Sequence, residues 1–159
     1  MSASTSERQA DALRRLDQEE SVWIATGNDQ GLPHFIPVSP AWDGTSVLVA
    51  TPTYSPTVRN ALASGWARAA LDSTADVVIF DADAEVVDFS TVSPDLLKTY
   101  VDRGGWNPND QPGDWSLLVL TPRVVLSWNS VAEIEGRIIM QGGWFADRQR
   151  EHRRPSRVR

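Results

Sequence analysis

The sequence predicts a mainly β protein, an antiparallel barrel of six to seven short strands with two or three short helices. Short apolar runs recur along the chain, and most of them are joined by connections of hairpin length. The alternation of strands and helices and the glycine-rich first turn of a doubly wound sheet are both missing. With 159 residues, 41% of them hydrophobic, and seven Trp, the chain can build one domain with a substantial core.

The N-terminal third of the chain reads as a polar helix followed by three strands. Over residues 4–20, Ala12, Leu13 and Leu16 fall on one face of a helix. Turn segments rich in Asn, Asp and Gly separate the apolar runs that follow. We expect these runs to form a meander of three strands, at 22–26, 32–38 and 45–51.

The remaining elements follow from their start and stop signals. A helix over 56–63 ends at Ser64 and Gly65, and a second helix begins at Ser93 and Pro94. The Gly, Pro, Asn and Asp of residues 104–114 predict a loop without regular structure. Further strands are expected at 67–71, 77–87, 115–128 and 135–140, and Pro122 implies a bulge or an edge position in the third of these.

Residues 47–62, VLVATPTYSPTVRNAL, have the character of a phosphate site. A strand ends in a turn rich in hydroxyl groups, Pro56 suits the first position of a helix, and the N–H groups of a helix start favour an anion. Arg59 adds a planar, permanently charged fork for phosphate oxygens. An ordinary strand, a Ser55 cap and a solvated Arg59 are the alternative reading of the same segment.

The flanking segments carry a resemblance to a known family. Residues 20–51, ESVWIATGNDQGLPHFIPVSPAWDGTSVLVAT, and residues 55–87, SPTVRNALASGWARAALDSTADVVIFDADAEVV, resemble the pyridoxamine 5'-phosphate oxidase-like flavin and deazaflavin reductases. VLTPRVVLSWN and GRIIMQGGW resemble the closing strand and C-terminal hairpin of that family, and the likeness covers about residues 13 to 145. The resemblance implies a split β-barrel and a homodimer with cofactor sites between its subunits. Many family members have Lys where this chain has Thr57.

The resemblance also implies site residues. Pro37, Val38 and Ser39 would lie along an isoalloxazine-like ring, although Pro37 and Val38 suit a barrel core equally well. The phosphate end would comprise Thr51, Thr53, Ser55, Thr57, Arg59 and Asn60. An internal hydrogen bond to a neighbouring loop is the alternative for Asn60. The substrate side would comprise Trp42, Trp106 and Trp144, although core or interface positions are the more common use of Trp.

Composition restricts the chemistry that the protein's own side chains could perform. There is no Cys, and His34 and His152 are the two His, so we expect neither a nucleophilic catalytic residue nor a metal site. Residues 147–159 hold six Arg, and the remainder has 9 basic and 19 acidic residues, a net charge of −10. This acidic body argues against nucleic-acid binding. No signal-like or membrane-spanning run occurs, so a cytoplasmic protein is expected.

These observations favour chemistry supplied by a cofactor. We expect residues 1–146 to form a single flavin-binding-like domain and residues 147–159 to form a flexible, Arg-rich tail. The function expected first is a flavin- or deazaflavin-dependent oxidoreductase that moves hydride between FMN, or the deazaflavin coenzyme F-420, and a small organic substrate. The alternatives are a binding module without turnover, for flavin, haem or another planar ligand, and a ligand-free interaction protein.

Overall fold

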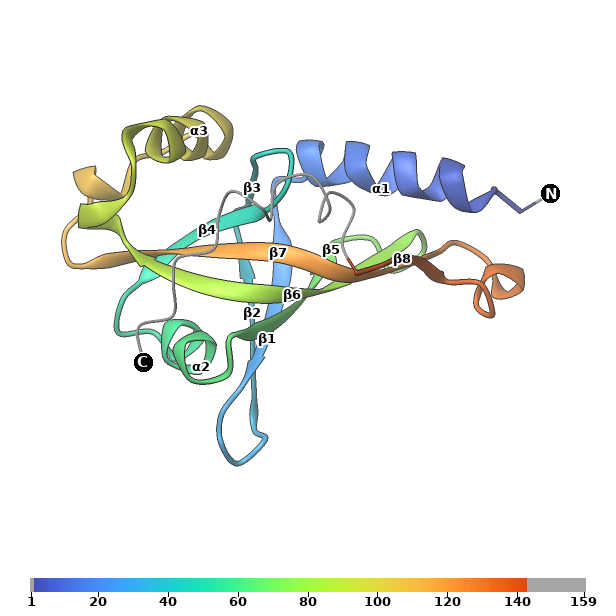
Figure 1. The fold of residues 1–159 in the computed structure, drawn as a ribbon, viewed down its shortest axis with the longest axis horizontal. Helices are drawn as coiled ribbons and strands as arrows, with labels where there is room; N and C mark the ends of the chain where they lie inside the picture. The colour runs from blue at the N-terminus through green and yellow to red at the C-terminus, as the bar shows by residue number, and fades with distance from the viewer. Residues whose placement is uncertain (1, 143–159) are drawn as a thin grey trace.

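The protein, described over residues 2–142 by a computed structural model, is one curled antiparallel sheet that forms part of a barrel, with three helices around it (Figure 1). The strands are β1 (Val22–Gly27), β2 (Pro33–Val38), β3 (Ala41–Trp42), β4 (Val47–Pro52), β5 (Trp66–Leu71), β6 (Val77–Asp88), β7 (Trp115–Trp128) and β8 (Ile138–Gln141). The helices are α1 (Thr5–Gln18), α2 (Pro56–Ser64) and α3 (Pro94–Gly104). The predicted mainly β class is confirmed; the predicted tail and Trp144 lie outside the described residues.

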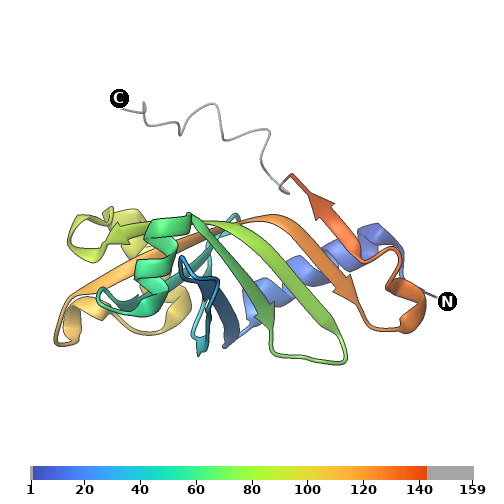
Figure 2. The same ribbon diagram turned by 90° about the horizontal axis from the view of Figure 1, so that it is seen from below.

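The order of strands across the sheet is β2-β1-β5-β6-β7-β4-β3, and β8 adds to β7. The predicted meander of the first three strands is therefore wrong: β2 pairs with β1, whereas β4 pairs with β3 and β7. Pro40 follows β2 and lacks the N–H that a continued ladder would need. In Figure 1 the β1–β2 hairpin crosses behind the long β6–β7 ribbon, and Figure 2 shows the curl from below. The sheet thus stays open between β2 and β4.

Two hydrophobic clusters lie on opposite faces of the β4–β7 pair. Val47, Val49 and Leu118 belong to the larger cluster, the core inside the curl of the sheet. Their neighbours Leu48 and Leu117 belong to a smaller cluster with residues of η1 (Phe89–Thr91) and α3. Because successive side chains of a strand point to opposite faces, each of these two strands contributes to both clusters.

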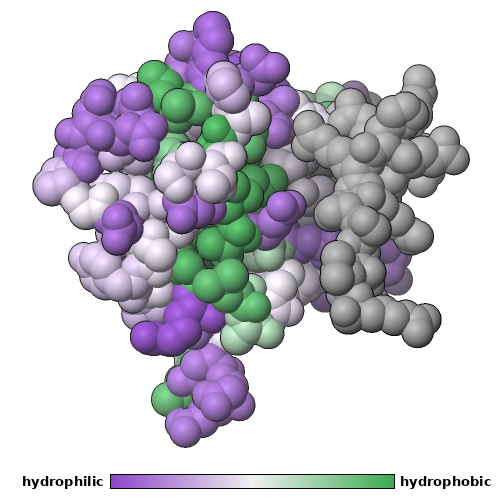
Figure 3. Space-filling model, turned by 60° about the vertical axis from the view of Figure 1, so that its left-hand side comes forward, coloured by the Kyte–Doolittle hydropathy of each residue, from purple (hydrophilic) through white to green (hydrophobic). Residues whose placement is uncertain are grey.

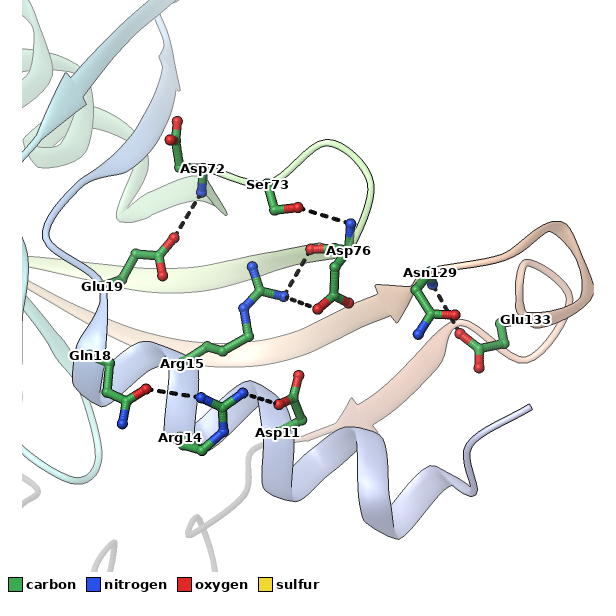
Figure 4. A network of polar contacts seen from close by, with 10 residues as sticks. All are labelled: Asp11, Arg14, Arg15, Gln18, Glu19, Asp72, Ser73, Asp76, Asn129 and Glu133. Atoms are coloured by element: carbon green, nitrogen blue, oxygen red, sulfur yellow. Dashed lines mark hydrogen bonds and ion pairs between the residues drawn. The ribbon is translucent and has the colours of Figure 1, made fainter. Parts of the chain in front are cut away.

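Helix α1 is fixed both at its start and near its end. Ser4 and Glu7 form a capping box, in which the Glu7 N–H donates to Ser4 Oγ at 3.2 Å and the Ser4 N–H donates to Glu7 Oε2 at 2.7 Å. Arg15 donates to the main-chain oxygen of Asp76 at 2.8 Å and pairs with its carboxylate at 3.2 Å (Figure 4). The helix is therefore tied to the turn between β5 and β6.

Two strands begin later than the sequence predicted, because side chains bind the main chain in the turns before them. The Asp43 carboxylate accepts the N–H groups of Thr45 and Ser46, so this segment is a turn and β4 begins after it. The connection before β8 contains the turn η3 (Val131–Glu133), and the Glu133 carboxylate accepts the Asn129 N–H (Figure 4). The strand predicted from residue 135 therefore begins later, at the start of β8.

The bulge expected from Pro122 is confirmed. Ala82 pairs with Pro122 and Asp81 pairs with Val124, which leaves Arg123 as the extra residue of β7. The predicted loop at 104–114 contains one short turn, η2 (Pro108–Asp110), capped by Asn107. Within residues 2–142, no helix has the length and apolar character needed to cross a membrane.

Candidate functional site

An open groove of about 510 Å³ lies where the sheet fails to close. One side is the outer edge of β2, which has a strand partner only in β1, and the other is β4, which beyond Leu48 pairs only with β7. Main-chain N–H and C=O groups on such free edges are available to a ligand. The groove is lined by Ser21, Ile36, Pro37, Val38, Ser39, Ala50, Thr51 and Trp106. It therefore brings together four residues predicted to bind the cofactor, Pro37, Val38, Ser39 and Thr51, and Trp106, which was predicted on the substrate side.

The half-buried Trp106 belongs to a chain of aromatic rings. Its ring centroid lies 5.9 Å from that of Tyr100 and 5.2 Å from that of Trp115, at interplanar angles of 74° in both pairs. Tyr100 in turn lies 5.9 Å from Phe89, again edge to face. Such geometry is the favoured one for aromatic pairs.

Tyr100 is completely buried next to the groove, and its hydroxyl has no hydrogen-bond partner among the described residues. Burial raises the pKa of Tyr100 to about 12, although the main chain of Ala50 and the indole of Trp106 act in the opposite direction. Both of these groups therefore lie close to the hydroxyl. The side chain is neutral at physiological pH.

The hydroxyl groups of the turn between β4 and α2 mostly serve the fold. Ser55 caps α2 by accepting the Val58 N–H at 3.3 Å, and it also accepts the hydroxyl of Thr51 at 3.3 Å. Thr53 shares a hydrogen bond of 2.9 Å with Ser116 of β7. The turn is thus fixed in place before any ligand binds.

Two residues predicted at the phosphate end are buried inside the protein. Thr57 has no exposed surface, and its hydroxyl has no partner within the described part of the chain. Asn60 is 5% exposed and donates to the hydroxyl of Thr26 in β1 at 3.2 Å. Neither side chain lines either of the two hollows described here, and the hydrogen bond of Asn60 runs to a strand, so a phosphate contact of Thr57 or Asn60 stays a prediction.

Arg59 lies instead on the exposed face of α2. It borders a second hollow of about 630 Å³, whose other lining residues are Thr53, Tyr54, Val58, Leu62 and Ala63. The other eight Arg and Lys side chains of residues 2–142 donate to a carboxylate or a main-chain oxygen. Arg59 is the one cation in this part of the chain with no such partner, so its charge is available to an anion.

The structure thus divides the predicted site into two hollows on either side of the β4–α2 turn. It also places Trp42, 6% exposed, in the larger hydrophobic core, which is the core position that the sequence left open for Trp. Sequence reasoning missed Ile36 and Ala50, whose neighbours Pro37 and Thr51 were identified. It also missed Ser21, because this residue precedes β1 and belongs to no recognisable motif.

Several solved structures have a fold similar to that of this protein. The fold resembles a pyridoxamine 5'-phosphate oxidase-related, FMN-binding protein from Nostoc punctiforme, with 16% identity, a TM-score of 0.53, and 79% of this chain and 83% of the other covered. It also resembles an F420 reductase, with 20% identity, a TM-score of 0.57 and coverages of 70% and 94%. The haem storage protein HutZ from Vibrio cholerae matches with 14% identity, a TM-score of 0.60 and coverages of 79% and 95%.

These likenesses show the fold, which is that of the pyridoxamine 5'-phosphate oxidase-like split barrels, as the sequence predicted. No protein-family model and no curated protein matches the sequence. Proteins with this fold include a reductase, an FMN-binding protein and a haem storage protein, so the fold alone leaves catalysis and ligand binding both open.

Proposed function

We propose that this protein binds FMN, or a deazaflavin coenzyme, in the groove and uses it to transfer hydride to or from a small organic substrate. The groove between the free edges of β2 and β4 carries the proposal. Its volume lies within the roughly 300–1,000 Å³ of small-molecule sites, and strand edges can meet the polar rim of a planar ring. Pro37, Val38 and Ser39 would border that ring from β2.

The phosphate end of the cofactor is assigned to Arg59. The charge of this side chain is not neutralised by any carboxylate of residues 2–142, and Thr53 lines the same hollow. With Thr57 buried, the anion would be held by one guanidinium and by hydroxyl or N–H groups of the turn. A bound flavin supplies the redox chemistry, and the protein positions it and limits the access of water.

A binding module for haem or another planar ligand is the second candidate, favoured by the fold shared with a haem storage protein. The lining that residues 2–142 give the groove argues against haem, since it includes no His, Cys, Met or Tyr, the side chains that ligate haem iron. Residues 2–142 also contribute no acidic or basic side chain to this lining, which is compatible with hydride transfer from a cofactor and with simple ligand binding.

We also propose a homodimer. Large exposed apolar side chains gather on and beside the β1–β2 hairpin and α2, and Figure 3 shows an apolar band on one face of the molecule with the hairpin at its lower end. The large exposed apolar side chains of the hairpin, of α2 and of the residues beside them are Leu32, Phe35, Tyr54, Leu62 and Trp66. A second subunit on this side would cover them and could complete the open groove.

Spectroscopic titration tests the function. The purified protein should bind FMN or a deazaflavin more tightly than hemin, and a reduced nicotinamide or reduced deazaflavin should bleach the bound cofactor. Binding without any reduction would favour the binding module. A protein that binds neither flavin nor deazaflavin would refute the proposal.

A further inference from the structure

Trp106 stands in a segment that has little regular structure to hold it. Residues 105–114 connect α3 to β7, and η2 is the one regular turn that the structure shows there. Segments of this kind are more mobile than the elements they connect unless side chains fix them. The position of Trp106 at the groove therefore depends on its neighbours, among them the rings of Tyr100 and Trp115.

Tyr100 is well placed to transmit rigidity from the fold to Trp106. It is on α3, it has no exposed surface, and Phe89 packs against its ring at 5.9 Å. Its hydroxyl faces the main chain of Ala50 and the indole of Trp106, and both of these residues line the groove. Tyr100 therefore stands behind two residues of the groove without reaching the groove itself.

The buried hydroxyl of Tyr100 lowers the free energy of unfolding, so it does not serve stability. A buried O–H donor that finds no acceptor loses the hydrogen bond that it would donate to water. Phenylalanine would fill nearly the same volume without that cost. Local arrangements that reduce stability are expected near functional sites, and this one adjoins the groove.

We infer that Tyr100 is a positioning residue, whose ring fixes Trp106 and whose hydroxyl spaces Trp106 from Ala50, so that the groove keeps the width a planar ring requires. The ligand side of this inference rests on the proposed function. Tyr100 would influence affinity without touching the ligand, since it has no surface in the groove.

The test compares Tyr100→Phe with Phe89→Leu, which alters a ring that packs on Tyr100 and not one of the two rings packed on Trp106. Tyr100→Phe should keep or raise stability to urea, yet weaken FMN binding by roughly three- to tenfold. Phe89→Leu should lower stability and change FMN affinity by less than about twofold. Unchanged FMN affinity in a folded Tyr100→Phe protein would overturn the inference.

A second measurement on the free protein separates this inference from the proposed function. The near-ultraviolet circular dichroism difference between wild type and Trp106→Phe reports the fixed indole of Trp106. This difference should shrink in the Tyr100→Phe background and persist in the Phe89→Leu background. If the wild type binds no FMN, the proposed function fails while the spectra still decide the positioning role; an undiminished difference in Tyr100→Phe refutes that role.

Discussion

Arg59 is conspicuous because of the charge around it. Residues 1–146 contain 19 acidic and 9 basic side chains, so a cation here would ordinarily find a carboxylate. Arg68, Arg123 and Arg15 all do so, whereas Arg59 does not. An unpaired guanidinium beside a hollow is the arrangement that an anionic ligand would complete.

Arg59→Ala should weaken FMN binding by roughly ten- to a hundredfold, because a partly shielded, charge-assisted contact is worth on the order of 1.5 to 3 kcal/mol. Arg59→Lys should recover part of the loss, since an ammonium cannot reproduce the fork. Riboflavin, which lacks the phosphate, provides the control and should bind both variants like the wild type. Equal losses of affinity for FMN and riboflavin would show that Arg59 does not bind the phosphate.

The raised pKa of Tyr100 predicts that the free energy of unfolding falls at alkaline pH. The usual tyrosine pKa is about 10, and burial raises the pKa of Tyr100 to about 12, so between these values the unfolded chain ionises while the folded protein retains the proton. The free energy of unfolding should therefore fall on the order of 2 kcal/mol as the pH rises through this window. Urea titrations at about pH 9 and about pH 11.5 measure it. Tyr100→Phe should lack this part of the loss, and an identical loss in both proteins would contradict the assignment.

At the scale of elements, α2 shows what the sequence could have predicted. Once residues 56–63 are assigned to a helix, Thr57, Val58, Asn60 and Ala61 share one face, and that face is buried. The hypothesis placed three α2 residues at the phosphate, and helical periodicity would have separated Arg59 from Thr57 and Asn60. The buried hydroxyl of Thr57 had no signal in the sequence, since a threonine at a helix start usually implies a cap.

Some irregularities of the strands could be predicted from single residues, whereas others depend on side-chain contacts or on very short strands. The bulge at Pro122 was predictable because proline cannot donate in a ladder. The turn at Asp43 depends on one carboxylate accepting two N–H groups. The burial of Trp42 follows from β3, a strand of two residues that no periodic pattern could reveal.

Helix α1 should depend on Arg8 far more than on Arg14. Arg8 is 9% exposed and donates at 2.8 Å to the main-chain oxygens of Ser127 and Gly136, so Arg8→Ala leaves both oxygens without this donor. We expect a loss of roughly 2 to 4 kcal/mol in the free energy of unfolding. Arg14→Ala, which removes an exposed pair with Asp11, should cost less than about 0.5 kcal/mol. Equal effects in urea titrations would show that the two Arg8 contacts contribute little.

At the scale of the whole molecule, the sequence predicted the class and most strands but not their order. The pairing of β4 with β7 joins residues about seventy positions apart, and nothing in either strand specifies its partner. The groove exists because β2 and β4 do not pair, so the mistaken meander concealed it. The site residues were predicted through a resemblance, and only the structure could show that several of them line two separate hollows.

The proposed dimer can be tested by sedimentation, which should give twice the 17.6 kDa of one chain. Leu32→Glu places a charge in the exposed apolar set beside the β1–β2 hairpin, and it should dissociate the dimer and weaken FMN binding. Val131→Glu is the matched control, because Val131 is 85% exposed but belongs to η3, outside that set. A wild-type monomer that binds FMN tightly would exclude the dimer as a requirement.

The two faces of the β4–β7 pair have a consequence for how the native protein opens. The cluster beneath α3 is the smaller one, and it is separated from the main core by the strands themselves. The amide hydrogens of α3 should therefore exchange with deuterium through a local opening of lower free energy than those of β5 and β6, which require global unfolding. Ligand in the groove should slow exchange in α3 through Trp106 and Tyr100. Uniform exchange free energies across all three elements would instead mean that the two clusters unfold as one unit.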